Sequence, residues 1–451
     1  MNMKNTVLSF ILAGSAMVML HSCKTNLKTE DVSSGSADFS RYVAIGNSLT
    51  AGYADGALSL HGQINSYPHM LSTQFMMVGG SNEFSIPYMN EGGGNDGSGN
   101  PRRTLGYVIP CGSNTASIAP VFDPSGSTPF NNVAANGPYN LVGVPGARAI
   151  DAVNPIYSAL NPFLQRFCLT PGVSTMLTEA IRSKPTFFTL WLGGNDALLY
   201  ATGGAVPPAN IFSPSLSDTT QVRVALQQMV DSLVLTGAKG AIANVPDVTS
   251  IPYFTTVPYN SVVLSQGKAD TLNQLYASVG LTAITWNAGA NGLMIADSAV
   301  GASSGFMRHA TANDLILLTT PGDSIRCGQW GISPAKPLAD RYVLDVAEKN
   351  QIQTYITNYN AAIASIATSK GLALVDMNAF MKTFKSGIVY NGIGLNATFV
   401  SGGGFSLDGI HPTPRGYALI ANEFISSINK KFGSTTPQVD VTKYNGVVFP
   451  R

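Results

Sequence analysis

Short apolar runs alternate with amphipathic helical patterns along most of this chain, and this alternation restricts the fold more than any other feature. Five runs have the length and composition of buried strands: residues 41–45, 140–144, 186–192, 240–245 and 372–376. Strands that alternate with helices build parallel sheets whose two faces are covered by helices. The sequence therefore predicts an α/β fold, a three-layer α/β/α sandwich with a mainly parallel five-stranded sheet.

Three segments carry apolar residues at the i, i+3, i+4 spacing of an amphipathic helix: residues 222–233, 352–366 and 417–428. Thr413 stands where the N-cap of the last helix belongs. Pro414 follows at the first helical position, where its missing N–H costs nothing. Each segment presents one apolar stripe, which is suited to packing on a face of the sheet.

Two long stretches interrupt the alternation. Residues 57–138 and 253–340 are rich in Gly, Asn, Ser and Pro and show no sustained periodicity. Loops of this length inside a compact domain are usually functional covers or local subdomains. We expect two insertions over one edge of the sheet, within one domain that covers residues 38–433 and is followed by a C-terminal tail, residues 434–451.

The first residues have the pattern of an export signal. Lys4 precedes an apolar stretch, residues 7–20, which is shorter than the ~20 residues that a membrane-spanning helix needs. The stretch ends at Leu20-His21-Ser22-Cys23, which resembles the bacterial lipobox, although His21 departs from the usual small or aliphatic residue. We expect a lipoprotein signal peptide over residues 1–22, a lipid on Cys23 and a polar tether over residues 23–37. An ordinary signal peptide with an incidental cysteine is the alternative interpretation.

This interpretation places the protein in the bacterial cell envelope, on the outer-membrane or periplasm side, attached to a membrane through its lipid. The formal net charge is +1 and no basic block is present, which argues against nucleic acid as a partner. No cysteine or histidine spacing argues for a metal site. Of Cys111, Cys168 and Cys327, one pair could form a disulfide in an exported protein, but the sequence does not choose which.

Ser48 follows the first apolar run, in the segment Gly46-Asn47-Ser48. A helix that begins here would aim its free N–H groups, and the positive end of its dipole, at a negative charge forming near the serine. Taken alone, a serine after glycine at a strand end is ordinary turn chemistry. Ser48 is therefore a candidate nucleophile that needs partners elsewhere in the chain.

Two further strand ends carry groups that can donate hydrogen bonds to an oxyanion. The second apolar run ends in Pro145-Gly146, where the glycine exposes its backbone N–H to close approach. The third run ends in Asn195-Asp196, which delivers a side-chain amide. Each segment would also serve as a plain turn. We expect Asp196 to orient the loop that carries Asn195.

The pair Asp408 and His411 gives the sharpest signal. The carboxylate stands three residues before the imidazole, directly ahead of a capped helix and next to two prolines that make a rigid mount. In a tight turn, Asp408 can accept a hydrogen bond from the ring Nδ1–H, which leaves Nε2 free to take a proton from a serine. On its own, an aspartate three residues before a histidine is more often a surface turn. The pair therefore indicates a catalytic site only together with the other segments.

Together and in this order, the four segments resemble the blocks of the SGNH (GDSL-type) hydrolases, named for Ser, Gly, Asn and His. The resemblance covers residues 38–433 outside the insertions and implies a bacterial lipoprotein member with a flavodoxin-like SGNH fold. It implies Ser48 as nucleophile, with Asp408 and His411 completing the triad. The Ser48 N–H, the Gly146 N–H and the Asn195 amide would form the oxyanion hole, and neither a metal nor another cofactor is implied.

One position departs from the family. The first block commonly reads Gly-Asp-Ser-Leu, whereas Asn47 stands here in place of the acid. The triad carboxylate comes from a different block, so the change should not abolish activity, but it removes a charge that could help to hold the serine loop.

The resemblance implies a serine hydrolase that cleaves carboxylic esters through an acyl-enzyme, an esterase or lipase. Its partner would be an ester substrate, either an acyl lipid or an acylated glycan. In an esterase or lipase, we expect aromatic residues of the insertions to shape a hydrophobic pocket. Two alternatives remain open: a carbohydrate O-acetyl esterase, which needs an open polar cleft, and a non-catalytic envelope lipoprotein that keeps the fold as a binding surface.

Overall fold

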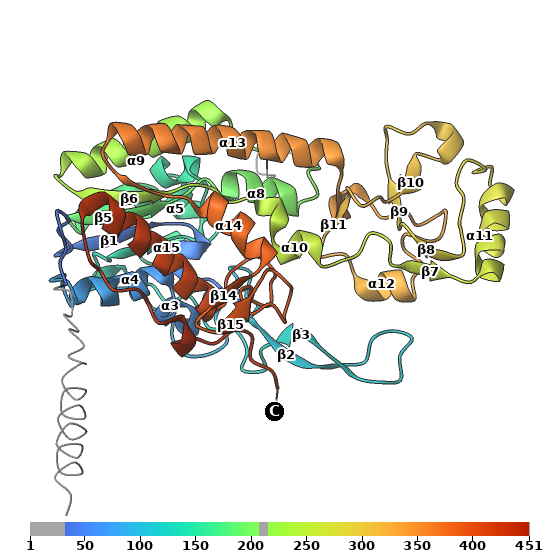
Figure 1. Ribbon diagram of the computed structural model, residues 1–451, viewed down its shortest axis with the longest axis horizontal. Helices are drawn as coiled ribbons and strands as arrows, with labels where there is room; N and C mark the ends of the chain where they lie inside the picture. The colour runs from blue at the N-terminus through green and yellow to red at the C-terminus, as the bar shows by residue number, and fades with distance from the viewer. Residues whose placement is uncertain (1–31, 207–214, 451) are drawn as a thin grey trace, which may run out of the picture. The chain divides into compact units, whose positions relative to one another are not determined.

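The computed structural model describes residues 32–206 and 215–450, and a five-stranded parallel sheet lies at its centre (Figure 1). Its strands stand in the order β13-β6-β5-β1-β4, so the chain starts inside the sheet, steps to one edge and then builds toward the other. The bounds are β1 Tyr42–Gly46, β4 Leu141–Gly143, β5 Phe187–Trp191, β6 Lys239–Ala243 and β13 Ala373–Val375. Every pairing between them is parallel, and the five predicted strands are confirmed.

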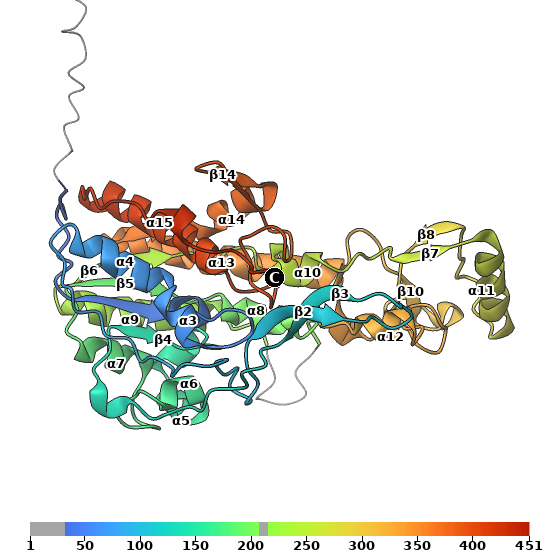
Figure 2. The ribbon, with the colours of Figure 1, turned by 90° about the horizontal axis from the view of Figure 1, so that it is seen from below.

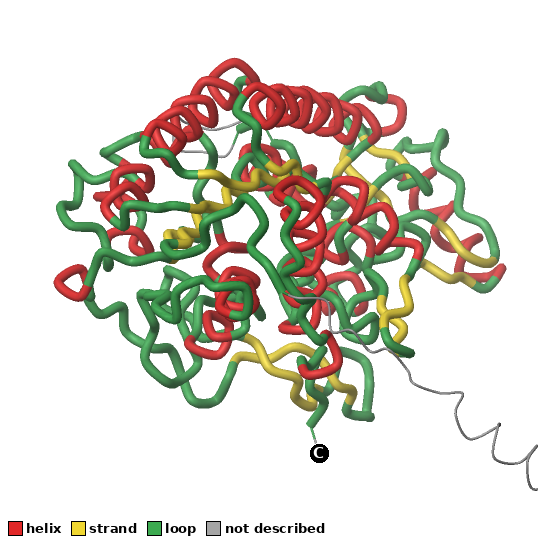
Figure 3. Tube along the Cα trace, turned by 60° about the vertical axis from the view of Figure 1, so that its left-hand side comes forward, coloured by secondary structure: helices red, strands yellow, loops and turns green. Residues whose placement is uncertain are grey.

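Helices cover both faces of this sheet, which gives the predicted three layers. On one face, α9 (Thr219–Leu235) packs against α13 (Val346–Ser369), and α7 (Met176–Arg182) lies against β1 and β4. On the other face, α15 (Pro414–Phe432) packs against α4 (Tyr67–Met76). In Figure 3, helices, drawn red, lie on both sides of the yellow strands. The strand order and the two covered faces are those of a doubly wound α/β fold.

The three predicted amphipathic helices are α9, α13 and α15, and their apolar stripes are buried. The last of them begins as expected. Thr413 is its N-cap, with a side-chain oxygen that accepts a hydrogen bond from the N–H of Gly416, and Pro414 is its first residue. A left-handed Gly433 closes its C-terminal end.

Residues 57–138 are only partly an insertion. They contain α3 (Leu60–Ile64) and α4, whose Tyr67, Leu71 and Phe75 are fully buried in the main core. The expectation of a loop-like stretch is wrong at this point, because α4 is one of the covering helices of the sheet. What projects is a hairpin of β2 (Arg103–Val108) and β3 (Ser117–Phe122), visible in Figure 2.

Residues 253–340 fall largely in a small unit with a core of its own. Its buried residues include Tyr276, Trp286 and Leu293, and they form a cluster separate from the main core. Its elements are β7 Val262–Leu264, α11 Gln266–Ser278, β8 Gly289–Asn291, β9 Met294–Ala296, β10 Met307–His309, β11 Leu315–Ile316, α12 Gly322–Arg326 and β12 Val343–Leu344. A disulfide between Cys111 and Cys327 ties this unit to the hairpin, while Cys168 is buried and free.

Shorter elements connect the layers. They are α2 Ser48–Ala51, α5 Tyr157–Leu160, α6 Pro162–Gln165, α8 Asn195–Thr202, α10 Pro252–Thr255, α14 Met377–Ser386, β14 Ile388–Tyr390 and β15 Ile393–Leu395. Two of them, α2 and α8, begin directly after the carboxyl ends of β1 and β5.

The predicted tether and tail both have contacts with the domain where the structure describes them. Ser36 donates its N–H to the carbonyl of Phe432 at the end of α15, and Asn422 bonds both backbone groups of Val439 in the tail. The predicted signal peptide, residues 1–22, and Cys23 lie outside the described residues. Among the helices that the structure describes, none combines the length and apolar character that a membrane span requires.

Candidate active site

Ser48 lies at the carboxyl end of β1, as the first residue of α2, and two glycines make this position possible. A Cβ atom on Gly46 would stand 2.0 Å from the Thr50 hydroxyl, and one on Gly143 would stand 2.4 Å from the Ala51 nitrogen. Both distances are too short for real contacts, so the close seating of α2 on the strand ends requires glycine on β1 and β4.

Asn47 is the N-cap of this short helix. Its side-chain oxygen accepts a hydrogen bond of 3.0 Å from the N–H of Leu49. An amide oxygen therefore performs the capping that a carboxylate would perform at the same place. The departure from the family pattern leaves the serine loop with its cap and without a negative charge.

Ser48, His411 and Asp408 form a continuous chain of close polar contacts. The Ser48 hydroxyl oxygen lies 2.8 Å from Nε2 of His411, and Nδ1 of the same ring lies 2.8 Å from Oδ2 of Asp408. When Nδ1 carries the proton and donates it to the carboxylate, Nε2 becomes the acceptor for the serine hydroxyl. Ser48 is buried, with 6% of its surface exposed.

Asp408 accepts five hydrogen bonds. Oδ1 accepts from the hydroxyl of Ser406 and from the backbone N–H groups of Ile410 and His411. Oδ2 accepts from the backbone N–H of Gly56 and from the His411 ring. Burial alone would raise the pKa of Asp408, but the nearby imidazole and these donors lower it to about 2. The carboxylate is therefore ionised at neutral pH and fixed in direction.

Gly146 and Asn195 follow the two strands that flank β1, β4 and β5. Gly146 has a left-handed φ of +82°, and the Asn161 amide bonds the carbonyl of Pro145 beside it. The Asn195 amide donates to the carbonyl of Ala147, which holds the two predicted segments together. Among the described residues, neither the Ser48 N–H nor the Gly146 N–H has a protein acceptor. These donors remain available to a ligand.

Asp196 joins the same two strand ends, in line with its expected role. Its side chain is fully buried, and Oδ2 accepts a 2.7 Å hydrogen bond from the N–H of Ala149. Burial raises the pKa of Asp196 to about 6, against the effect of that hydrogen bond. The contact fixes the start of α8, and with it Asn195, relative to the loop after β4.

Sequence reasoning missed two residues beside the imidazole. The ring centroid of Tyr53 lies 4.7 Å from that of His411, and Asp55 accepts a hydrogen bond from the N–H of Leu407. The dipeptide Asp55-Gly56 is a strong turn signal and would have marked the place as a tight turn. Nothing local to the sequence indicates that this turn meets a loop more than 350 residues later.

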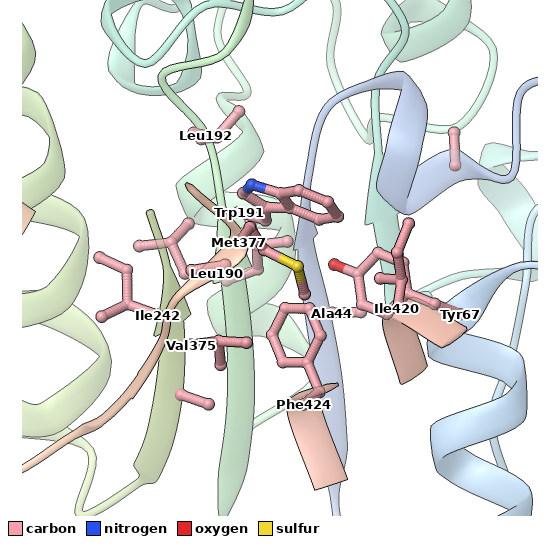
Figure 4. Packing of buried hydrophobic residues seen from close by; sticks show 14 of the residues in the cluster. Ala44, Tyr67, Leu190, Trp191, Leu192, Ile242, Val375, Met377, Ile420 and Phe424 are labelled. Carbon is pink, nitrogen blue, oxygen red and sulfur yellow. The ribbon is translucent and has the colours of Figure 1, made fainter. Parts of the chain in front are cut away.

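An apolar pocket of about 80 Å³ lies on the α14 and α15 side of the strand ends. Leu49, next to Ser48, and Ile410, next to His411, line it together with Met377, Phe384 and Ile420. Figure 4 shows Trp191, Met377 and Ile420 among the buried side chains of this region. None of its lining residues belongs to either insertion, so the insertions do not shape this pocket.

Within residues 32–206 and 215–450, no three His, Cys, Asp or Glu side chains are grouped as metal ligands would be.

A model of the GDSL-like Lipase/Acylhydrolase family matches residues 42–424. Among solved structures, a lipase/acylhydrolase from Enterococcus faecalis is similar at 14% identity, with a TM-score of 0.33 and coverage of 88% of this chain and 98% of that chain. An extracellular lipase from Streptomyces rimosus is similar at 12% identity, with a TM-score of 0.33 and coverage of 86% and 98%. The comparison with curated proteins gives no match.

Proposed function

The chain belongs to the GDSL-like lipase/acylhydrolase family, whose members hydrolyse esters in general, and on this premise we propose that it cleaves carboxylic esters through a Ser-His-Asp mechanism. Ser48 would be the nucleophile, His411 the general base and Asp408 the carboxylate that orients the ring. The observation that carries the proposal is the unbroken contact from hydroxyl to imidazole to carboxylate, 2.8 Å at each step.

The reaction proceeds in two acyl transfers. His411 takes the proton of Ser48 as the oxygen attacks the ester carbonyl, and a tetrahedral oxyanion forms. The imidazolium then gives that proton to the leaving alkoxide, and the alcohol departs from the acyl-enzyme. Water, deprotonated by the same ring, attacks the acyl group in turn, and the ring returns the proton to the Ser48 oxygen as the acid is released. Asp408 stays ionised throughout and stabilises the protonated ring.

The oxyanion requires hydrogen-bond donors at the moment when its charge develops. The Ser48 and Gly146 N–H groups and the second amide hydrogen of Asn195 fulfil this role in the proposal. The two N–H groups have no protein acceptor among the described residues, and the Asn195 amide is held in place by its other hydrogen on Ala147. Donors that are fixed before the reaction pay no reorganisation cost during it.

The apolar pocket supports an acyl chain as the part of the substrate that gives binding energy. Leu49 and Ile410 belong to both the pocket lining and the two loops that carry the nucleophile and the base. An apolar chain buried there gains ~25 cal/mol per Å² removed from water. We therefore propose esters with an apolar acyl chain as substrates, whereas a glycan O-acetyl group would leave this pocket empty.

Hydrolysis of p-nitrophenyl esters from acetate to laurate tests the proposal, with acetylated xylan as the glycan arm. We expect kcat/KM to rise with chain length until the pocket is filled. A fluorophosphonate probe should label the wild type and a Ser232→Ala control, whose half-buried serine lies on α9, but not Ser48→Ala. A folded wild type that neither reacts with the probe nor hydrolyses any ester would refute the proposal and favour a non-catalytic binding protein.

We also propose that the protein is exported and carries its lipid on Cys23. The Cys111–Cys327 disulfide supports this location, because such bonds persist in oxidising compartments. Mass spectrometry of the mature N-terminus and membrane fractionation of Cys23→Ser test it. An unprocessed N-terminus, or unchanged membrane association of the variant, would contradict it.

A further inference from the structure

The turn after α2 has an unusual backbone at a residue with a charged side chain. Asp55 has a left-handed φ of +57° and Gly56 has a φ of +85°, and the N–H and carbonyl groups of Ala54 and Ala57 pair across them. Two successive residues with positive φ make a tight turn for which Asp-Gly is a favoured dipeptide. This backbone directs the N–H groups of the turn outward, toward the loop that carries Asp408.

Three hydrogen bonds join the turn to that loop. The Asp55 N–H donates to the Ser406 hydroxyl over 2.9 Å, and the Gly56 N–H donates to Oδ2 of Asp408 over 2.9 Å. In the reverse direction, the Asp55 carboxylate accepts the N–H of Leu407 over 2.9 Å. The turn therefore contacts three consecutive residues, 406–408, and one of its bonds ends on the oxygen that faces the imidazole.

We propose that Asp55 is a positioning residue of this site, which acts on His411 through Asp408 and through its own negative charge. Its turn holds the direction of the Asp408 carboxylate, and its own carboxylate, bonded to the N–H of Leu407, adds a second negative charge that interacts electrostatically with the ring. A protonated imidazole is present during both acyl transfers, so a second carboxylate stabilises the state in which the ring holds the Ser48 proton. The kinetic part of this inference rests on the proposed ester hydrolysis.

The groups around Asp55 act on its pKa in opposite directions. Burial raises the pKa of Asp55 to about 6, the Leu407 N–H opposes that rise and Asp408 adds to it. Arg102 and His411 favour the ionised form of Asp55. Asp55, His61 and Arg102 line one cavity, so His61 also lies near this carboxylate. Because the pKa of Asp55 in the folded chain lies above its ordinary value of 3.8, ionised Asp55 lowers the stability of the fold. This loss of stability grows as the pH rises from 3.8 to about 6.

The variant Asp55→Asn separates a positioning role from a purely structural one, because it removes the destabilising charge and keeps the turn. Asn tolerates the left-handed conformation and keeps an amide oxygen for the Leu407 N–H, so Asp55→Asn preserves the turn while removing the charge. We expect this variant to have an equal or higher Tm at pH 8 and a kcat/KM roughly 3–10-fold lower. A residue that only shaped the turn would show no loss of kcat/KM.

Two pH measurements complete the test. The acid limb of the kcat/KM profile should move to lower pH by about 0.5 unit in Asp55→Asn, because a negative charge near the ring is lost. The NMR titration midpoint of the His411 ring, in histidine-labelled protein, should move in the same direction. Asp231→Asn, which removes an exposed carboxylate on α9, is the matched control and should change neither.

Asp55→Ala removes the acceptor as well as the charge, and we expect a larger loss of kcat than in Asp55→Asn if it folds. A wild-type kcat/KM and an unmoved His411 midpoint in Asp55→Asn would overturn the inference. The NMR titration does not depend on turnover, so it decides the point even if the wild type hydrolyses no ester and the proposed function fails.

Discussion

Replacing Asp408 by Asn tests the centre of the proposed mechanism. The carboxylate accepts five hydrogen bonds, three on Oδ1 and two on Oδ2. An Asn side chain offers one oxygen and one NH2 group, so in either rotamer an NH2 faces groups that can only donate. If the NH2 group faces the imidazole, the ring must adopt the tautomer that is protonated on Nε2. His411 then has no lone pair on Nε2 to accept the proton of Ser48.

The substitution Asp408→Asn is expected to change both stability and catalysis. The pKa of Asp408 is lowered from its ordinary value of 3.8 to about 2 in the folded chain, a difference that corresponds to roughly 2 kcal/mol of stability. Because the folded-state pKa is depressed, this stability is complete above pH 3.8 and is lost as the pH falls toward 2. For catalysis, loss of the correct tautomer costs roughly 10⁴-fold in kcat in a serine protease with the same arrangement, and we expect roughly 10³–10⁴-fold here.

Urea unfolding at pH 7 measures the change in stability, and p-nitrophenyl ester hydrolysis measures the change in catalysis. We expect Asp408→Asn to lose both stability and turnover, and Ser48→Ala to lose turnover alone. Asp231→Asn removes an exposed carboxylate on α9 that pairs with Lys370 at the surface, and it should lose no turnover and little stability. A folded Asp408→Asn variant whose kcat stays within tenfold of the wild type would show that the carboxylate does not orient the base, and the mechanism would be wrong.

Three other substitutions give separate checks. Asn195→Ala should lower kcat by roughly 10²–10³ with little change in KM, because the amide acts on the oxyanion and not on the bound ester; an unchanged kcat would remove it from the site. Ile420→Trp fills the apolar pocket and should reduce kcat/KM for laurate roughly tenfold or more while sparing acetate, whereas equal effects on both would place the acyl chain elsewhere. Gly143→Ala places a Cβ atom 2.4 Å from the Ala51 nitrogen, so it should lower the free energy of unfolding in urea by about 1–3 kcal/mol and reduce labelling of Ser48 by the fluorophosphonate probe. Gly267→Ala, which has open space around the added Cβ atom, should change neither quantity.

The sequence indicated much of the architecture because the relevant signals are local. Five apolar runs and three helical patterns coincide with the strands and the principal helices. The start of α15 was visible from Thr413 and Pro414, since capping is chemistry between neighbours. Each candidate site residue also stands at a strand or helix end, which is a property that a linear pattern can reveal.

The local sequence pattern did not predict helix α4. Its residues lie in a stretch rich in polar and small residues, and Pro68 stands inside its first turn. Proline is accepted there because the first N–H groups of a helix have no intrahelical partner. Burial of Tyr67, Leu71 and Phe75 against the sheet makes this segment a core helix, and only the packing of the whole domain provides that burial.

By itself, the sequence determined the order of strands and helices and the residue types that stand at their ends. Tertiary structure alone decided that Gly56 meets Asp408, that Cys111 meets Cys327, and that α14 rather than either insertion lines the apolar pocket. The physical reason is that periodicity and capping depend on neighbours along the chain. A contact between distant segments depends instead on how all the layers pack together, and no short pattern carries that information.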